Sequence, residues 1–260
     1  MPEFHDDLRS AVADGQITAV FQPQVDVPSR RIVGVETLAR WDHPELGLLT
    51  PDRFIPLAER GDGIHDIGMA MLEAGWRLAS SFHAAGTPID VAVNVSARQL
   101  ADPGLPDRIW NLLGGSEVPP SCLTLEITES YAILDVAGVA HRLQGLRDVG
   151  VGVSIDDFGV GYSSMERIEE LPVNELKVDI AMVQDMSDAG YASFLEIVEY
   201  SHARAIRVVA EGVETLEQRS RVEMLRCQRA QGWLYARPMA EEPLRELVAR
   251  GAVLGDALPA

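Results

Sequence analysis

Hydrophobic and polar residues alternate with a period of two in eight short segments rich in Val, Ile and Leu. The segments lie at 18–27, 31–40, 90–96, 123–128, 151–158, 175–180, 206–212 and 230–236. Successive side chains of a β-strand point to opposite faces, so this period is typical of a strand. In 90–96, for example, Val91 and Val93 share one face, while Ala92 and Asn94 share the other. We therefore predict eight strands, each with one aliphatic face.

Most of these segments are separated by stretches in which hydrophobic residues recur every three or four positions. The pattern is clearest at 64–82, 136–146 and 191–198, and it predicts amphipathic helices. Gly150 is placed to cap the second of these helices at its C-terminus. A further helix is expected in the polar, acidic stretch 1–15.

Strands that alternate with helices over 260 residues predict an α/β fold, here a modified (β/α)8 TIM-type barrel. The modification concerns the first strand. Only residues 28–30 connect it to the second strand, whereas a parallel pair needs a crossover of about a dozen residues. We therefore expect an antiparallel first strand. Because no low-complexity linker interrupts the chain, residues 1–260 are interpreted as a single domain.

Polar residues stand near the ends of most predicted strands, on the face opposite the large aliphatic residues. They are Glu36, Asn94, Glu126, Asp156, Lys177 and Asp179. One such residue is uninformative, but the same arrangement on several strands is typical of a barrel active site, which lies at the carboxyl ends of the strands. Asp157 would point away from this site if its strand continued. It can face the site only if the strand stops there, which Gly159 and Gly161 permit.

The predicted site is rich in hard oxygen ligands. These are Glu36, Asn94, Glu126, Asp156, Asp157 and Glu211. Such ligands suit Mg2+ or Mn2+ rather than zinc. Several converging carboxylates favour two ions bridged by Asp156, and a pair of ions suits phosphoester hydrolysis. The alternative for Asp156 and Asp157 is a solvated turn, because Asp and Gly are common turn residues.

Two basic residues accompany these acids, and each has two readings. Lys177 either balances the acids in an ion pair or orients a metal-bound water. Arg40 either lies on the surface beyond its strand or reaches a phosphate group of a ligand.

The chain as a whole is acidic, with 40 Asp and Glu residues against 22 Lys and Arg and a formal net charge of −18. Such a charge repels polyanions, so we expect no nucleic-acid polymer as a partner. The two cysteines form no CxxC pair, which fits a reducing compartment. No apolar run is long enough to span a bilayer, and the N-terminus lacks the pattern of a signal peptide. A cytoplasmic location is therefore expected.

Nine sequence segments occur in a specific order and spacing. They read "FQPQVD", "VGVETLARWDHPELG", "FIPLAE", "VNVS", "LEITES", "DDFGVGYSS", "LPVNELKVD", "VVAEGVET" and "QGWLYARP". They resemble the EAL-domain family of cyclic di-GMP phosphodiesterases, and the match runs from about Phe21 to Met239, with a core match of about 17–245. The resemblance implies hydrolysis of cyclic di-GMP to linear pGpG with Mg2+ or Mn2+, and inhibition by Ca2+. It also implies a homodimer and, in a longer parent protein, an adjoining sensory or diguanylate cyclase domain.

The resemblance further implies roles for individual residues. The metal ligands would be Glu36, Asn94, Glu126, Asp156, Asp157 and Glu211. The catalytic residues would be Lys177, beside the attacking water, together with Asp156 and Glu211. The substrate-contacting or supporting positions would be Gln22, Arg40, Asp179, Glu214 and Gln231. Glu129 would anchor the loop that follows the paired aspartates.

Two positions and one segment depart from the family pattern. Thr37 stands where Ala is usual, but strand parity places it on the outer face, so the chemistry should survive. Val160 stands where Thr is usual, and the lost hydroxyl could alter the order of its loop and the coupling between subunits. The segment 59–64, with its changes at Gly61–Gly63, has no assigned consequence.

Two other functions compete with a phosphodiesterase. A receptor would bind cyclic di-GMP without turnover, which Val160 favours and the complete set of acids opposes. An enolase-type barrel would use Mg2+ and a lysine base to remove a proton beside a carboxylate. That reading leaves Asn94, Arg40 and the antiparallel first strand unexplained.

Overall fold

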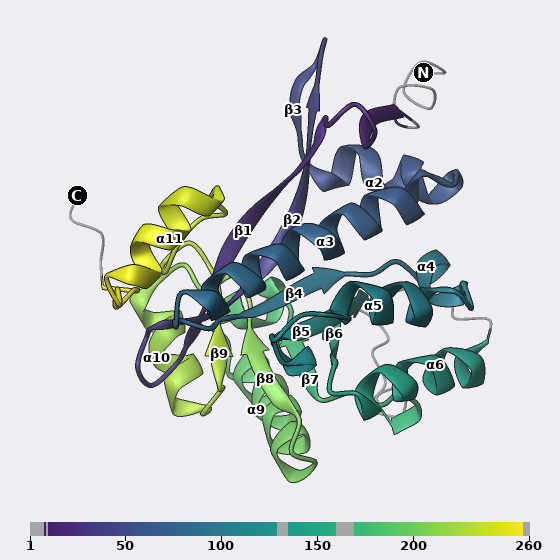
Figure 1. Cartoon of the computed structure of the whole chain (residues 1–260). Helices are drawn as coiled ribbons and strands as arrows, with labels where there is room; N and C mark the ends of the chain where they lie inside the picture. Colours follow the sequence, from purple (N-terminus) through teal and green to yellow (C-terminus); the bar gives the residue numbers. More distant parts are fainter. Residues whose placement is uncertain (1–7, 9, 129–134, 160–168, 257–260) are drawn as a thin grey trace.

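A sheet that closes on itself forms the centre of the computed structural model, which describes residues 8, 10–128, 135–159 and 169–256 (Figure 1). Its described strands are β1 (Ile17–Asp26), β2 (Ile32–His43), β3 (Gly47–Leu49), β4 (Asp90–Asn94), β5 (Leu123–Thr128), β6 (Gly152–Phe158), β7 (Glu175–Val178), β8 (Arg207–Ala210) and β9 (Arg229–Ala230). Their order is β1-β9-β8-β7-β6-β5-β4-β2-β3, and β1 also pairs with β2. This last pairing closes a barrel of eight of the described strands, as predicted.

The first strand of the barrel is antiparallel to both of its neighbours, β2 and β9. The other described neighbours around the barrel are parallel. The cause is the short link after β1, where the N–H of Arg30 donates to the carbonyl of Asp26 over 2.7 Å and closes a tight turn. The predicted antiparallel strand is therefore confirmed. The register places Gln22 of β1 directly opposite Glu36 of β2.

The last predicted strand, 230–236, is wrong beyond Ala230. Gly232 has a φ of +153°, and a Cβ on it would lie 2.2 Å from the carbonyl oxygen of Val213. Only glycine lets the two backbones approach so closely. The chain then turns, and the N–H of Tyr235 donates to the carbonyl of Gly232 over 3.0 Å. The sequence pattern also missed β3, which extends the β2 hairpin beyond the barrel (Figure 1).

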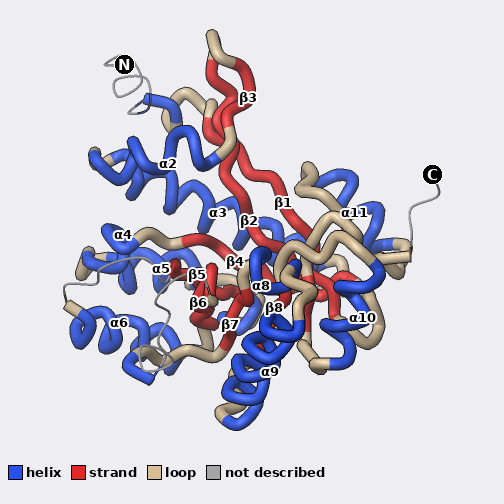
Figure 2. The backbone as a smooth tube through the Cα atoms, turned by 180° about the vertical axis from the view of Figure 1, so that it is seen from behind, coloured by secondary structure: helices blue, strands red, loops and turns tan. Residues whose placement is uncertain are grey.

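Helices surround the barrel, as the view from behind also shows (Figure 2). The described ones are α2 (Pro51–Arg60), α3 (Gly63–Ala84), α4 (Ala97–Ala101), α5 (Leu105–Leu113), the 3-10 helix η1 (Pro120–Cys122), α6 (Val136–Asp148), α8 (Ile180–Gln184), α9 (Asp188–Ala203), α10 (Leu216–Met224) and α11 (Glu241–Ala249). Helices α3, α6 and α9 confirm the three predicted periodic stretches. Gly150 follows α6 with a φ of +105°, in keeping with its predicted capping place. Most of the helix expected at 1–15 lies outside the described residues.

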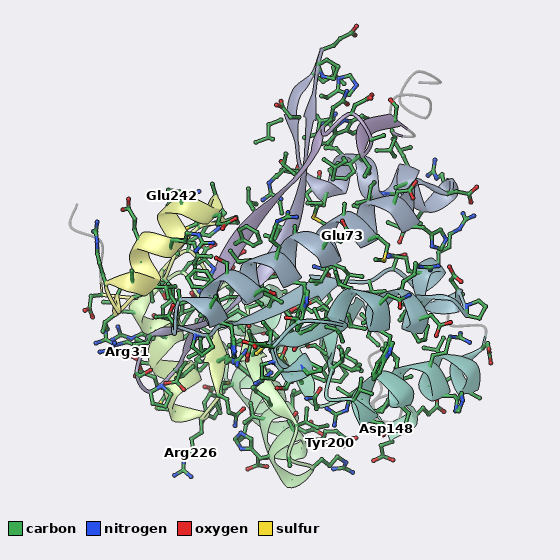
Figure 3. The ribbon with its side chains drawn as sticks, in the orientation of Figure 1. Arg31, Glu73, Asp148, Tyr200, Arg226 and Glu242 are labelled. Atoms are coloured by element: carbon green, nitrogen blue, oxygen red, sulfur yellow. The ribbon has the colours of Figure 1, made fainter. Side chains whose placement is uncertain are left out.

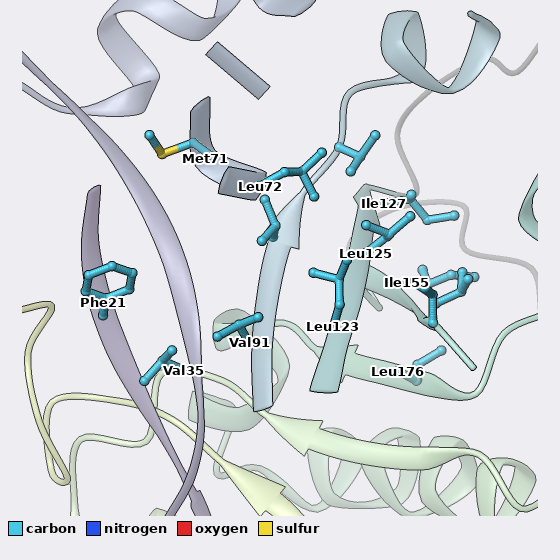
Figure 4. Packing of buried hydrophobic residues seen from close by; sticks show 14 of the residues in the cluster. Phe21, Val35, Met71, Leu72, Val91, Leu123, Leu125, Ile127, Ile155 and Leu176 are labelled. Atoms are coloured by element: carbon cyan, nitrogen blue, oxygen red, sulfur yellow. The ribbon is translucent and has the colours of Figure 1, made fainter. Parts of the chain in front are cut away.

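The aliphatic faces of the strands form the main core between barrel and helices (Figure 4). Val91 of β4 and Leu123 of β5 are fully buried there. Close packing needs a small residue on the covering helix α3. A Cβ on Gly75 would lie 3.0 Å from Oγ1 of Thr37 and 3.2 Å from Cγ2 of Val93. Thr37 therefore faces α3, as strand parity predicted, while its neighbour Glu36 faces the barrel interior.

Charged side chains cover the outside of the molecule, where Glu73, Asp148 and Glu242 are exposed (Figure 3). Within the part of the chain that the structure describes, no helix combines the length and the apolar composition that crossing a bilayer requires.

The hydroxyl of Thr37 generates a prediction about stability. Its Oγ1 is buried and has no hydrogen-bond partner among the described residues. Replacing it with a methyl group in Thr37→Val removes an unsatisfied polar atom without changing the shape of the side chain. We expect the free energy of unfolding to rise by about 1 kcal/mol in urea denaturation.

The matched control is Thr18→Val, at an exposed position of β1. It should change the free energy of unfolding by less than about 0.5 kcal/mol. A Thr37→Val protein that is less stable than the unaltered chain would show that the hydroxyl has a favourable interaction.

Candidate active site

Lys177 lies at the centre of the barrel, surrounded by carboxylates. It is the only lysine of the chain, and its side chain is 1% exposed. Its Nζ lies within ion-pair distance of four acids from four strands or strand ends: 2.9 Å from Asp156, 2.9 Å from Glu211, 3.1 Å from Glu126 and 3.4 Å from Glu36. Strand parity brings Glu36, Glu126 and Asp156 together, because each occupies the inward face of its strand, and Glu211 follows directly after β8. The predicted cluster of acids around Lys177 therefore exists.

The cluster shifts the pKa of its members in different directions. Burial alone would lower the pKa of Lys177, but the four carboxylates outweigh it and hold that pKa well above its ordinary value. Burial raises the pKa of Glu126 well above its usual range and the pKa of Glu211 to about 8, against the attraction of Lys177. Without further cations, one ammonium is too little charge for all of these carboxylates. Some of them therefore keep a proton near neutral pH.

Glu36 is the acid of this cluster that is best supplied with hydrogen-bond donors. Its Oε1 accepts from Nδ2 of Asn94 over 2.8 Å, and its Oε2 accepts from Nε2 of Gln231 over 2.9 Å. Burial opposes its ionisation, but the charge of Lys177 and these two hydrogen bonds prevail, so the pKa of Glu36 is lowered. Gln231 also donates to Oε1 of Glu211 over 2.7 Å. Its amide thus connects two of the carboxylates that contact Lys177.

Asp157 joins the site by a different route from the one predicted. The strand does not stop at Asp156, because β6 continues to Phe158. Instead, Ile155 pairs with Leu176 and Phe158 pairs with Val178, so β6 uses three residues where β7 uses two. Such an extra residue defines a β-bulge. Asp157 sits in this bulge with a φ of +57°, a left-handed conformation that Asp tolerates better than most residues. The bulge lets two consecutive aspartates face the same site.

Two groups of three carboxylates have oxygen atoms within 4.8 Å of one another. One contains Glu36, Glu126 and Asp156, the other Asp156, Asp157 and Glu211. Asp156 belongs to both, as a bridging ligand would. The buried Oε1 of Glu126 has no hydrogen-bond partner among the described residues, and an unpaired buried carboxylate oxygen is costly. The residues present therefore fit hard divalent cations.

A cavity of about 460 Å³ opens beside Asn94, Asp156 and Asp157. Its walls are mostly apolar and come from β2 and helices α2 and α3, with Ile55, Ile64, Ile67 and Met71 among the lining residues. These wall residues have no polar signature in the sequence, where Ile64, Ile67 and Met71 belong to the helical pattern predicted at 64–82. A cleft of this size beside a charged cluster is typical of a site for a small molecule.

The altered segment 59–64 forms the end of α2 and the start of α3. Its Glu59 and Ile64 line the cavity. Asp62 instead pairs with Arg98 of α4 over 2.9 Å, and the same guanidinium donates to the carbonyl of Glu59 over 2.8 Å. The departures from the family pattern at this segment therefore lie at the edge of the cavity and are tied to α4.

The remaining predicted site residues lie at different distances from the cluster. Gln22 lies opposite Glu36 in the β1–β2 hairpin, and Arg40 lies four residues farther along β2. Burial lowers the pKa of Arg40, and the charges of Glu36 and Asp52 oppose this shift. Asp179 accepts from the N–H of Ala181 over 2.6 Å and so caps α8.

Other predicted positions are less closely tied to the cluster. Glu214 is exposed, and its described hydrogen bond uses the backbone N–H, which donates to Gln218 over 2.7 Å. Glu129 and Val160 lie outside the described residues.

Gln24 is a polar residue near the cluster that was not among the predicted site residues. Its Nε2 donates to Oε1 of Gln231 over 3.2 Å. The available signal was its position, because Gln24 follows Gln22 by two residues and therefore shares the inward face of β1.

The raised pKa values predict how stability depends on pH in the metal-free protein. Burial, followed by the charge of Asp156, raises the pKa of Asp157 to about 6, and the pKa of Glu211 is about 8. The folded chain thus keeps protons that the unfolded chain has released. The free energy of unfolding should therefore fall as the pH rises from about 5 to about 8.

Urea denaturation with EDTA, repeated across this pH range, measures the effect. Excess Mn2+ should reverse it, because a bound cation favours ionised ligands. Glu211→Gln should reduce the slope in EDTA, since it removes the group with a pKa of about 8. A free energy of unfolding that stays constant or rises over this pH range would contradict the raised pKa values of Asp157 and Glu211.

Comparison with known proteins identifies the family of the chain. A family model described as the EAL domain matches residues 5–238. The bifunctional diguanylate cyclase/cyclic di-GMP phosphodiesterase MucR of Pseudomonas aeruginosa is 40% identical over 246 residues, which cover 94% of this chain and 36% of MucR. Cyclic di-GMP phosphodiesterase RocR of the same organism is 37% identical over 238 residues, which cover 91% of this chain and 61% of RocR. The chain thus spans less than two thirds of either relative.

Solved structures agree with this match. A structure described as the PaMucR phosphodiesterase in a c-di-GMP complex is 39% identical, has a TM-score of 0.87, and covers 93% of this chain and 99% of that chain. The FimX EAL domain of Pseudomonas aeruginosa has a TM-score of 0.84 at 20% identity, over 92% of this chain and 98% of that chain, and this likeness concerns the fold alone. The chain therefore belongs to the EAL domain family.

Proposed function

We propose that this chain is a cyclic di-GMP phosphodiesterase that hydrolyses its substrate to linear pGpG with Mg2+ or Mn2+. The observation that carries the proposal is the presence of two groups of three carboxylates near Lys177, with Asp156 as a member of both groups. Membership of the EAL domain family supports it, as do relatives named cyclic di-GMP phosphodiesterases. The c-di-GMP complex of the similar PaMucR phosphodiesterase supports the choice of substrate.

The residues assigned to the metal ions are those that the sequence predicted. They are Glu36, Asn94, Glu126, Asp156, Asp157 and Glu211. Bound divalent cations would supply a water of lowered pKa and neutralise charge on the phosphate oxygens. Hard oxygen ligands favour Mg2+ or Mn2+, and Ca2+, which prefers longer bonds and a larger coordination number, is expected to inhibit.

Lys177 acts in this proposal as a fixed cation. Its pKa lies well above the ordinary value, so the group stays protonated and donates hydrogen bonds to an attacking water and to the charge that develops on it. A lysine that neighbouring carboxylates hold in its protonated form is a poor base for removing a proton from carbon. This argues against the enolase-type alternative, which needs a neutral lysine.

The substrate would lie between the acid cluster and the apolar cavity. Arg40 is four residues from Glu36 on the same strand and has the fork of donors that suits a phosphate. Gln22, Asp179, Glu214 and Gln231 are the other residues proposed to contact or support the substrate. The apolar walls of the cavity suit the face of a nucleobase.

The chain is proposed to work as a single module, cytoplasmic and dimeric, within a longer parent protein. The multidomain relatives support the last point, because this chain spans only 36% of MucR. A receptor without turnover is the weaker alternative, since the sequence keeps every predicted oxygen ligand and the carboxylates lie in two adjoining groups of three.

Turnover of cyclic di-GMP tests the proposal. Purified protein with Mn2+ should give pGpG, separated by chromatography, and EDTA or excess Ca2+ should suppress the product. Asp156→Asn should lower kcat by at least about 100-fold, because it removes the negative charge of the shared ligand and leaves one of its two side-chain oxygens. Asp148→Asn, at an exposed acid of α6, is the matched control and should keep full activity. Binding of cyclic di-GMP without any pGpG would make the chain a receptor.

The assignment of Arg40 has its own test. Arg40→Ala removes a charged donor from the proposed phosphate contact and should raise KM by about tenfold to 100-fold. Arg53→Ala, at an exposed position of α2, is the matched control and should leave KM unchanged. An Arg40→Ala enzyme with unaltered KM would place Arg40 outside the substrate contacts.

A further inference from the structure

The amide of Gln231 has a demanding position in the site. Both hydrogens of its Nε2 are used, one toward Oε2 of Glu36 over 2.9 Å and one toward Oε1 of Glu211 over 2.7 Å. These two carboxylates belong to different groups of proposed metal ligands. The distance between the two groups of ligands therefore depends on the position of the Gln231 amide. It also depends on the nitrogen of that amide, rather than its oxygen, facing Glu36 and Glu211.

The other end of this amide contacts Gln24. The side chain of Gln24 is 1% exposed, and its Nε2 donates to Oε1 of Gln231 over 3.2 Å. This contact satisfies the oxygen that the two carboxylates would repel. Among the described residues, Gln24 is the side-chain donor to Oε1 of Gln231.

Gln24 is itself tightly enclosed. The β1–β2 register places it opposite Gly34. A Cβ on Gly34 would lie 3.3 Å from Oε1 of Gln24 and 3.1 Å from Nη1 of Arg229. The absent side chain at position 34 thus makes room for a polar layer directly below the acid cluster. Within this layer the amide of Gln24 has little freedom to move away from Gln231.

We propose that Gln24 is a positioning residue for the divalent cations, acting through Gln231. This inference rests on the proposed function, since it concerns the same metal site. Gln24 holds the oxygen end of the Gln231 amide, and the nitrogen end of that amide then fixes Glu36 and Glu211. Without Gln24, the Gln231 oxygen is buried without a donor, and the amide can shift or rotate away from the two carboxylates.

Mn2+ binding in the absence of substrate tests the inference. The spectrum of free Mn2+ in electron paramagnetic resonance is lost on binding, so a titration gives the dissociation constant directly. Gln24→Met keeps the length of the side chain and removes its donor. We expect Mn2+ to bind about tenfold more weakly, because residues that orient ligands typically change metal affinity by that order.

A matched control separates positioning from general destabilisation. Gln16→Met removes a similar side-chain hydrogen bond, in which Gln16 accepts from Nε1 of Trp41 over 3.0 Å at the far end of the hairpin. It should lower the melting temperature without changing Mn2+ affinity. Equal weakening of Mn2+ binding in both variants would overturn the proposal, as would unchanged affinity in Gln24→Met.

A double-mutant cycle tests whether Gln24 acts through Gln231. Gln231→Met alone should weaken Mn2+ binding at least as much as Gln24→Met. Adding Gln24→Met to Gln231→Met should then change the affinity by less than about twofold, because the intermediary is already lost. Two effects that multiply in the double variant would overturn the proposed route.

Two further results keep the inference separate from folding and from the proposed function. If Gln24→Met does not fold, Gln24→Asn carries the same expectation, because its shorter amide stays polar but no longer reaches Gln231. If the unaltered protein binds Mn2+ but makes no pGpG, the proposed function fails while the comparison of Mn2+ affinities stands. If the unaltered protein does not bind Mn2+, both are overturned.

Discussion

Repulsion among buried carboxylates is the constraint on which the rest of this structure depends. Four acids converge on the interior of the barrel, and a single ammonium, that of Lys177, lies between them. Carboxylates at this depth persist only where cations, hydrogen-bond donors or protons compensate their charge. The fold supplies all three: the ammonium at the centre, the amides of Asn94 and Gln231 beside Glu36, and raised pKa values on Glu126 and Glu211. Divalent cations would replace the protons without rearranging the strands.

The layered structure of the barrel offsets the energetic cost of burying these charges. Aliphatic residues on the outer faces of the strands pack against the helices, and the burial of this apolar surface stabilises the fold. The inner faces are then free to carry polar groups close to one another. The antiparallel β1 contributes to this interior in a way that the parallel strands do not, because it enters from the opposite end. Its Gln22 pairs with Glu36 in the strand register, and its Gln24 donates to Gln231, which in turn donates to Glu36.

Much of this arrangement could be predicted from the sequence, because parity along a strand is a strong geometric rule. It placed Glu36 inward and Thr37 outward, and the short link after the first strand predicted its direction. The bulge at Asp157 could not be predicted, since it depends on how β6 pairs with a strand twenty residues away. Nor could the turn after Ala230, where apolar residues continue the strand pattern but the backbone of Val213 is too close. The apolar walls of the cavity could not be predicted for a related reason. The sequence pattern is the same for an isoleucine that lines a cleft and for one that packs in the core.

The distribution of basic residues has a further consequence. Apart from the histidines, every basic side chain of this protein other than Lys177 is an arginine. Isotope labelling of lysine would therefore place one side-chain ammonium signal in a magnetic resonance spectrum, and that signal would come from the centre of the barrel. Exchange of its protons with water would report how often the interior opens, and its chemical shift would follow the charge around it. The protein thus carries an internal probe at its most crowded point, without any substitution.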